Sequence, residues 1–347
     1  MNENKNQNRN RNSMARAPRA GLRALVALAL ALAAATAQAE RVLRASHQWP
    51  GGKGDIRDEM VQIIAREVNA AGVGLRVQVY PGKSLYKPKE QWGAMVKGRL
   101  DISAFPLAYA GGRHPEFNLT LMPGLVKNHE HAARLNRSEF MRRIRSIIER
   151  AGVVVLADTW LAGGFVSKKR CVLWPRDVRG QRFRAAGKAF NQMLAAAGAS
   201  INSMPSSEIY SALQTGVLDG ANTSSSSLIS YRIYEQVRCL TAPGEYTLWF
   251  MYEPILMSKK TFDSLTPAQR LVVMKAAGKA EQYAYEHAKR EDERLVRVYR
   301  EHGVEVVSMN REQFEAWRRI AEKASYRRFA EEVKGGRELL DLALSVK

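Results

Sequence analysis

Short apolar runs alternate with longer amphipathic segments along the first half of the chain. The longer segments repeat apolar residues every three or four positions, which predicts helices, and the short runs predict strands. The predicted strands are residues 41–49, 75–81, 100–105 and 152–160, and the predicted helices are residues 54–72 and 89–98. This alternation predicts an α/β protein with a mostly parallel sheet, which binds ligands beyond the carboxyl ends of its strands.

A helix–glycine–strand pattern occurs twice. The segments EQWGAMVKGRLDISAF (residues 90–105) and EIYSALQTGVLDGANT (residues 208–223) align without a gap, and each follows a predicted strand and a proline. The matched pairs are Glu90/Glu208, Trp92/Tyr210, Ala94/Ala212, Met95/Leu213, Gly98/Gly216, Leu100/Leu218 and Asp101/Asp219. Each glycine is placed to end its helix in the left-handed conformation. Chance recurrence of a common unit is the alternative, but the match favours two lobes of similar construction.

Three segments connect the predicted lobes. The first is TWLAGGF, residues 159–165, where two glycines offer a hinge, and the second is a strand-like return near residues 246–250. A helical pattern then runs from Thr266 to about His302, interrupted only by Gly278. Such a helix would span roughly 50 Å and brace both lobes. Coiled-coil dimerisation is the weaker alternative because no clean heptad persists.

The N-terminus has the features of an export signal. A basic stretch precedes the short apolar run ALVALALALAAATA, which ends on the small-x-small pattern Ala37-Gln38-Ala39. We interpret residues 1–39 as a signal peptide, with an uncleaved anchor or a disordered tail as the alternatives. No later segment is long and apolar enough to cross a bilayer. An exported chain without an anchor indicates a periplasmic protein.

The net charge of the chain does not alter this interpretation. The formal net charge of +20 falls to +15 once the six cations and the single acid of residues 1–39 are removed. The cations are interspersed with acids, which is typical of a solvated surface and not of nucleic-acid binding. The remaining 308 residues suit two domains with sizeable cores.

The chemistry-bearing residues indicate binding and not catalysis. Cys171 and Cys239 are the only cysteines, and an even count in an exported chain favours a disulfide over two buried thiols. His129 and His131 form at most a weak metal motif, and we find no nucleophile, phosphate-loop or metalloprotease pattern. The sequence therefore predicts no enzyme activity, no metal and no cofactor.

One cation stands out at a predicted strand end. GQRFRAAG, residues 180–187, places Arg182 and Arg184 two positions apart, just before a helical stretch. A buried guanidinium is costly unless it is paired. Arg184 is therefore either solvated, paired within the protein, or approached by a negatively charged ligand.

At this point the chain resembles a known family, the extracytoplasmic solute receptors of tripartite ATP-independent periplasmic (TRAP) transporters. The resemblance covers essentially the whole exported chain. It is strongest from KKRCVLWPRDVRGQRFRAAG through GASINSMPSSEIYSALQTGVLDGANTS. It implies a two-lobed periplasmic-binding-protein fold, with lobe I formed by residues 40–160 and 249–288 and lobe II by residues 161–248 and 289–347. It also implies a small organic acid as ligand and the TRAP membrane subunits as partners, with a monomeric receptor and no nucleic acid.

The resemblance assigns roles to individual residues. The arginine that grips the ligand's carboxylate falls on Arg184, and Arg182 is interpreted as a structural or surface cation. An asparagine common in the family falls near Asn222 and Thr223. The other expected ligand contacts, chosen because they lie where the mouth of the sheet should be, are Trp49, Lys87, Tyr109 and Trp249.

The chain departs from the family pattern at two places. The serine run 224–227 replaces the usual proline, although it could equally cap a helix. Gly163-Gly164-Phe165 stands where many members have a second arginine, so a second clamped carboxylate is not implied. The competing interpretations are a receptor of the ATP-binding-cassette type, a periplasmic enzyme and a partner of a periplasmic sensor.

Overall fold

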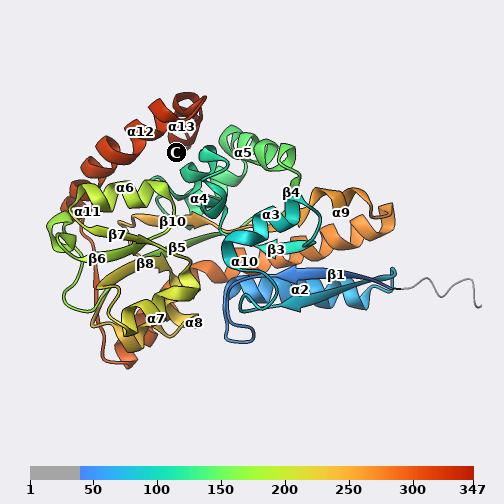
Figure 1. Ribbon diagram of the computed structural model, residues 1–347, viewed down its shortest axis with the longest axis horizontal. Helices are drawn as coiled ribbons and strands as arrows, with labels where there is room; N and C mark the ends of the chain where they lie inside the picture. Colours follow the sequence, from blue (N-terminus) through green and yellow to red (C-terminus); the bar gives the residue numbers. More distant parts are fainter. Residues whose placement is uncertain (1–39) are drawn as a thin grey trace, which may run out of the picture. The chain divides into compact units, whose positions relative to one another are not determined.

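The structure is a computed structural model that describes residues 40–347, so the predicted signal peptide lies outside the described residues. Two β-sheets form the framework (Figure 1). The five-stranded sheet has the order β2 (Leu75–Tyr80), β1 (Arg41–Ser46), β3 (Ile102–Ala104), β11 (Ile255–Ser258) and β4 (Val153–Ala157). The seven-stranded sheet has the order β12 (Glu305–Ser308), β9 (Cys239–Ala242), β5 (Trp160–Ser167), β8 (Gly220–Ser224), β6 (Arg182–Ala185) and β7 (Ser200–Ser203), with β10 (Trp249–Tyr252) also paired to β5.

The helices cover both sheets (Figure 1). The α-helices are α2 (Ile56–Ala70), α3 (Gln91–Val96), α4 (His129–Asn136), α5 (Glu139–Arg150), α6 (Lys188–Ala196), α7 (Ile209–Gln214), α8 (Ser225–Ser230), α9 (Lys259–Asp263), α10 (Pro267–Glu301), α11 (Arg311–Ala321), α12 (Arg327–Glu332) and α13 (Gly336–Leu344). The two-lobed α/β fold predicted from the sequence is confirmed.

The internal repeat corresponds to two equivalent units. In β1-α2-β2-α3-β3 and in β6-α6-β7-α7-β8, the first strand lies between the other two and is parallel to both. Gly98 and Gly216 end α3 and α7 with positive φ, as predicted. The repeated aspartate has one function in both units, because Asp101 accepts the Arg44 N–H at 2.8 Å and Asp219 accepts the Arg182 N–H at 2.9 Å. Each carboxylate thus fixes the first strand of its unit against the last.

The chain crosses between the sheets at two adjacent points. It passes from β4 to β5 at Asp158–Thr159 and returns from β10 to β11 at Glu253–Pro254, a few residues beyond the predicted return segment. The Glu253 N–H donates to the Thr159 carbonyl at 2.9 Å, so the two crossings are bonded to each other.

The glycine pair of the first crossing has a steric role. Gly163 and Gly164 lie inside β5, which is paired on both sides, and neither has a positive φ. A Cβ at Gly163 would lie 2.1 Å from the Thr223 carbonyl oxygen, and one at Gly164 would lie 2.2 Å from the Thr241 carbonyl oxygen. These glycines permit close approach of neighbouring backbone, and the hinge role expected from the sequence stays a prediction.

Helix α10 braces both lobes, as predicted. It is 35 residues long, begins after the N-cap Thr266 and ends at His302, which corresponds to roughly 50 Å. Its first two thirds bury an alanine-rich stripe in the core of the five-stranded sheet, whereas Leu295 and Tyr299 enter a core of the seven-stranded sheet. Figure 1 shows α10, in orange, passing from the side of α2 to the side of α8.

The remaining sequence predictions concern covalent structure and membrane segments. Cys171 and Cys239 form the predicted disulfide, which joins the segment after β5 to the start of β9. Within residues 40–347, no helix is both long and apolar enough to span a membrane.

Candidate ligand-binding site

Arg184 lies near the carboxyl end of β6 and is 1% exposed. Its Nε donates to the Met204 carbonyl at 2.9 Å, its Nη1 to the Asn222 carbonyl at 2.6 Å, and its Nη2 to the Tyr109 hydroxyl at 3.1 Å. All three acceptors are neutral, and within residues 40–347 no carboxylate forms an ion pair with this guanidinium. Burial lowers the pKa of Arg184 because the charged form loses water. A guanidinium has five N–H groups, so two remain for another acceptor.

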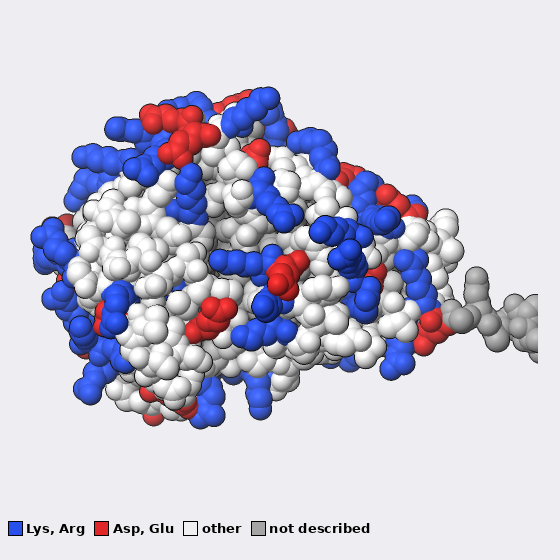
Figure 2. Space-filling model, in the orientation of Figure 1, with Lys and Arg blue, Asp and Glu red and all other residues white. Residues whose placement is uncertain are grey.

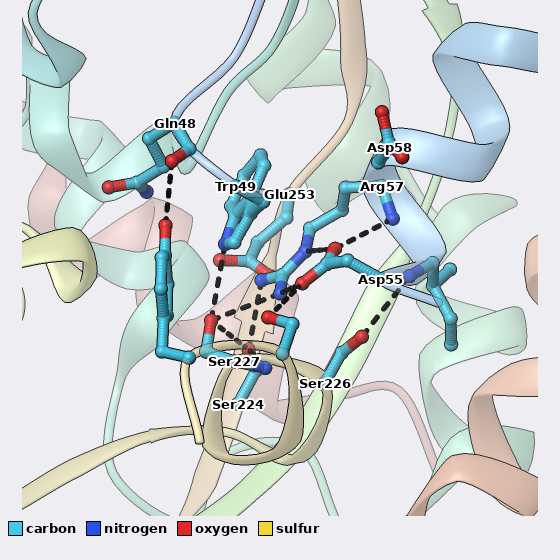
Figure 3. A network of polar contacts seen from close by, with 12 residues as sticks. Gln48, Trp49, Asp55, Arg57, Asp58, Ser224, Ser226, Ser227 and Glu253 are labelled. Carbon is cyan, nitrogen blue, oxygen red and sulfur yellow. Dashed lines mark hydrogen bonds and ion pairs between the residues drawn. The ribbon is translucent and has the colours of Figure 1, made fainter. Parts of the chain in front are cut away.

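Arg57, at the start of α2, differs from Arg184 because its hydrogen bonds are complete (Figure 3). It is 0% exposed, and all five of its N–H groups have acceptors. Asp55 accepts two of these bonds at 2.7 and 2.8 Å, and Glu253 accepts one at 2.5 Å. Burial acts to lower the pKa of Arg57, but the carboxylates of Asp55 and Glu253 more than offset this and raise it. Its ion pairs and hydrogen bonds are complete without a ligand.

Arg182 has a structural role, as the sequence interpretation proposed. Its Nε donates to Asp219 Oδ2 at 3.0 Å and its Nη2 to Asp219 Oδ1 at 3.1 Å. The hydrogen bond from Arg182 holds the pKa of the Asp219 carboxyl well below its usual range. The two arginines of the GQRFRAAG segment are therefore distinct: one pairs with an acid at the lobe surface, and the other is buried without an anion.

Several buried polar atoms close to the strand ends lack hydrogen-bond partners within the described chain. They include Oδ1 and Nδ2 of Asn222, Nε1 of Trp249 and Oε1 of Gln48. Asn222 is opposite Phe165, and Trp249 is opposite Gly163, so both side chains lie on one face of the sheet. Buried polar groups are normally satisfied, so these atoms are unusual, but Arg184 is paired with Ala221 and its side chain lies on the opposite face from Asn222 and Trp249.

Tyr109 connects the two lobes at this point. It belongs to the short 3-10 helix η2 (Leu107–Ala110), which follows β3. Its hydroxyl oxygen receives N–H groups from Arg184 at 3.1 Å, from the Ser206 backbone at 3.0 Å and from the Gln48 side chain at 3.4 Å. Three donors therefore converge on a neutral oxygen, which is a pattern that a carboxylate oxygen would satisfy better.

The serine run forms a contact surface between the lobes. Ser224 is the N-cap of α8, as the capping interpretation proposed. Its Oγ also accepts from Arg57 Nη1 at 2.9 Å, Ser226 Oγ accepts the Ile56 N–H at 3.1 Å, and Ser227 Oγ accepts from Trp49 Nε1 at 3.2 Å. Figure 3 shows these serines on α8 facing the Arg57 cluster. The run thus fixes the first turn of α2 against the second lobe.

The structure separates the predicted site residues into two groups. Arg184, Tyr109 and the main-chain carbonyl of Asn222 form the buried region around the guanidinium, whereas the side chains of Asn222 and Trp249 lie on the other face of the sheet. Thr223 is buried and alternates with Asn222 along β8, so its side chain lies on the face of Arg184, which is paired with Ala221. The remaining two lie elsewhere: Trp49 stacks on the Arg57 guanidinium at 3.9 Å, and Lys87 is exposed before the 3-10 helix η1 (Pro88–Glu90).

The sequence interpretation missed Gln48, Arg57 and Glu253. Gln48 directly follows the first predicted strand, and that position could have drawn attention to it. Arg57 and Glu253 are 196 residues apart in the chain, and Arg57 falls on what reads as the solvent face of an amphipathic helix. No local pattern distinguishes such a residue from a surface cation.

The arrangement can hold an anion but offers little for metal chemistry. The single group of potential metal ligands found in the described chain combines Glu305 with Cys171 and Cys239, whose sulfurs are joined in the disulfide. The site has a guanidinium, a phenol and a side-chain amide, which bind and orient a ligand without supplying an activated nucleophile.

Comparisons with known proteins agree with this geometry. The sequence model for bacterial extracellular solute-binding protein family 7 (DctP) matches residues 56–332. A solute-binding protein of Albidiferax ferrireducens is 38% identical over 306 residues, covering 87% of this chain and 90% of the relative. The C4-dicarboxylate-binding periplasmic protein DctP of Rhodobacter capsulatus is 27% identical and covers 80% and 84% of the two chains.

The fold is also that of solved receptors. The crystal structure of a TRAP periplasmic solute-binding protein from Rhodoferax ferrireducens, with bound malonate, is 38% identical with a TM-score of 0.84, covering 88% of this chain and 98% of that one. The protein therefore belongs to the bacterial extracellular solute-binding proteins of family 7. It is a periplasmic receptor of the TRAP type, and the family is non-catalytic.

Proposed function

We propose that the protein captures a small carboxylate at Arg184, between its lobes, and delivers it to the membrane subunits of a TRAP transporter. The observation that carries this proposal is the incomplete set of partners of Arg184. Its guanidinium is 1% exposed, retains two N–H groups and forms no ion pair within residues 40–347, whereas Arg57 uses all five N–H groups. A carboxylate would supply the missing charge and two acceptors in the planar geometry that a guanidinium matches.

The neighbouring groups support a ligand with further polar atoms. Gln48 offers an acceptor, and Thr223, whose side chain lies on the same face of the sheet as Arg184, offers a hydroxyl. A ligand that satisfied them would be oriented as well as bound. The 38% identical receptor was crystallised with malonate, a short carboxylate with further polar atoms. We therefore propose malonate and related short carboxylates as the first ligands to test.

A second strong clamp for carboxylate is not part of the proposal. The position where many family members have another arginine lies at Gly163–Gly164, and a Cβ at Gly163 would be only 2.4 Å from the Trp249 ring. A side chain on this stretch of β5 has no room without movement of the neighbouring strands. We infer that the far end of the ligand is held by the neutral amide of Gln48 and by Tyr109, and that the receptor acts as a monomer.

A thermal-shift screen tests the proposal. Short mono- and dicarboxylates, including malonate, would be compared with their neutral amides. We expect the carboxylates alone to raise the melting temperature of the wild type, because ligand that binds the folded state stabilises it. Arg184→Ala should lose the effect and Arg319→Ala should keep it, since Arg319 is an exposed cation on α11. Equal shifts for acids and amides, or shifts that survive Arg184→Ala, would contradict the proposal.

A further inference from the structure

A second cavity lies beside Tyr109 on the first lobe. It has a volume of about 390 Å³ and is formed by η1, α3 and the segment around η2. Its polar and aromatic lining residues are Tyr86, Lys89, Glu90, Trp92, Lys97, Arg99, Tyr109 and Arg113. No residue of the second lobe lines it. The cavity is therefore distinct from the buried surroundings of Arg184, although it shares Tyr109 with them.

The cavity is strongly basic. Lys89, Lys97, Arg99 and Arg113 are all exposed, and Glu90 is the single acid in the lining. None of the four cations forms an ion pair with any described residue from 40 to 347. Figure 2 shows Lys and Arg side chains, with few acids among them, near the centre of the face that carries α3. Like charges gathered without counter-charges attract an anion.

A glycine keeps part of this cavity open. Gly93 lies in α3, and a Cβ placed on it would be 3.7 Å from Arg113 Nη1. The Arg113 guanidinium thus lies over a surface without a side chain. An anion next to Gly93 could meet the Arg113 guanidinium, which forms no ion pair with any residue from 40 to 347.

Tyr109 is the wall between the cavity and Arg184. Its ring is half-buried and lines the cavity, and its hydroxyl oxygen accepts from Arg184 Nη2. A movement of this one side chain would open the cavity toward Arg184. The same movement would free the Ser206 N–H and the Arg184 N–H that now point at the phenol oxygen. The two donors would then be available to a carboxylate.

We propose that the basic cavity is an encounter site for carboxylates, which holds the ligand weakly before it passes Tyr109 and reaches Arg184. This rests on the proposed function of Arg184. Contacts with exposed cations are individually weak and are screened by salt over about 8 Å at physiological ionic strength. The site should therefore bind malonate with a dissociation constant of roughly 1–10 mM at low salt, and its main effect should be on the association rate.

The encounter site can be detected without Arg184. Malonate would be titrated into ¹⁵N-labelled Arg184→Ala protein at low salt, with backbone amide shifts as the readout. We expect saturable shifts at Gly93, Lys97 and Gly112, which vanish in 0.5 M NaCl. Adding Arg99→Gln and Arg113→Gln should abolish them. A matched control, Arg319→Gln with Arg327→Gln, removes two exposed arginines that form no ion pair in the described chain and should leave the shifts unchanged.

Stopped-flow binding of malonate to the protein with Arg184 intact provides the second readout. The pair Arg99→Gln and Arg113→Gln should lower the association rate about three- to tenfold at low salt while the dissociation rate stays within twofold. Absence of the amide shifts, or an association rate equal to that of the control pair, would overturn the encounter site. Malonate affinity that is the same with and without Arg184 would instead overturn the proposed function, while the amide titration still decides the encounter site.

Discussion

The two buried arginines should respond in opposite ways to the same substitution. Methionine has a similar length and removes the charge, so Arg57→Met and Arg184→Met form a matched pair. In Arg57→Met, the carboxylates of Asp55 (0% exposed) and Glu253 (3% exposed) lose the buried cation with which they form ion pairs. Removing one partner of a buried ion pair typically costs about 3–5 kcal/mol, because the other charge stays buried and unpaired. We expect a loss of that size in the free energy of unfolding.

In the absence of ligand, Arg184→Met changes the free energy of unfolding through two opposing effects. The substitution loses three hydrogen bonds to neutral acceptors, each worth about 0.5–1.5 kcal/mol net. It also removes a buried charge that forms no ion pair with a carboxylate within residues 40–347, and that relief acts in the opposite direction. We expect the stability of unliganded Arg184→Met to lie within about 1 kcal/mol of the wild type or above it, as often happens when a binding residue is replaced.

Urea unfolding followed by circular dichroism measures both effects. The m-value should stay constant, so that the midpoints report stability directly. A loss of about 3–5 kcal/mol for Arg184→Met, equal to that for Arg57→Met, would refute the reasoning, since it would mean that Arg184 already has all the partners it needs. An unchanged Arg57→Met would show that the network around Asp55 is not the structural element described above.

Three further predictions concern the framework. Replacing both Cys171 and Cys239 by serine should cost about 4 kcal/mol, because the disulfide closes a 68-residue loop, and a melting curve unchanged by reductant would contradict this. Asp219→Asn should lower the free energy of unfolding by about 2 kcal/mol at pH 7. The folded-state pKa of Asp219 lies below its unfolded-state pKa near 4, so this stabilisation is complete above pH 4 and is lost as the pH falls further. A difference between mutant and wild type that grows below pH 4 would be inconsistent with this. Gly163→Ala should cost about 1–3 kcal/mol through backbone contact, whereas the control Gly278→Ala, with open space around it in α10, should gain up to about 1 kcal/mol.

The framework of this protein was predictable because its signals are local. The repeat of residues 90–105 and 208–223 reappears as two βαβαβ units, since helix caps, glycine stops and strand patterns act over a few residues. The 35-residue helix α10 was visible from its apolar period and its Thr-Pro start. The disulfide followed from two cysteines in an exported chain.

The site was less predictable because its partners come from distant segments. Arg57 and Asp55 occupy the polar face of α2, which the amphipathic pattern assigns to solvent, yet the second lobe covers them. Trp49 looked like a ligand contact because it follows a strand, but its ring lies on Arg57. Whether a buried arginine has all its acceptors depends on the closed arrangement of both lobes, and no local pattern encodes it.

Titration calorimetry with malonate on the wild type, Arg184→Ala and Arg184→Lys tests the central claim most directly. If another short carboxylate raises the melting temperature more than malonate does, that carboxylate would be titrated instead. Losing one partner of a desolvated charge pair costs about 2–5 kcal/mol, so Arg184→Ala should bind roughly thirty- to several-thousand-fold more weakly. Lysine should restore only part of the affinity, because a point charge cannot form two parallel hydrogen bonds. An Arg184→Ala variant that binds as tightly as the wild type would contradict the account, because the carboxylate would then be held elsewhere.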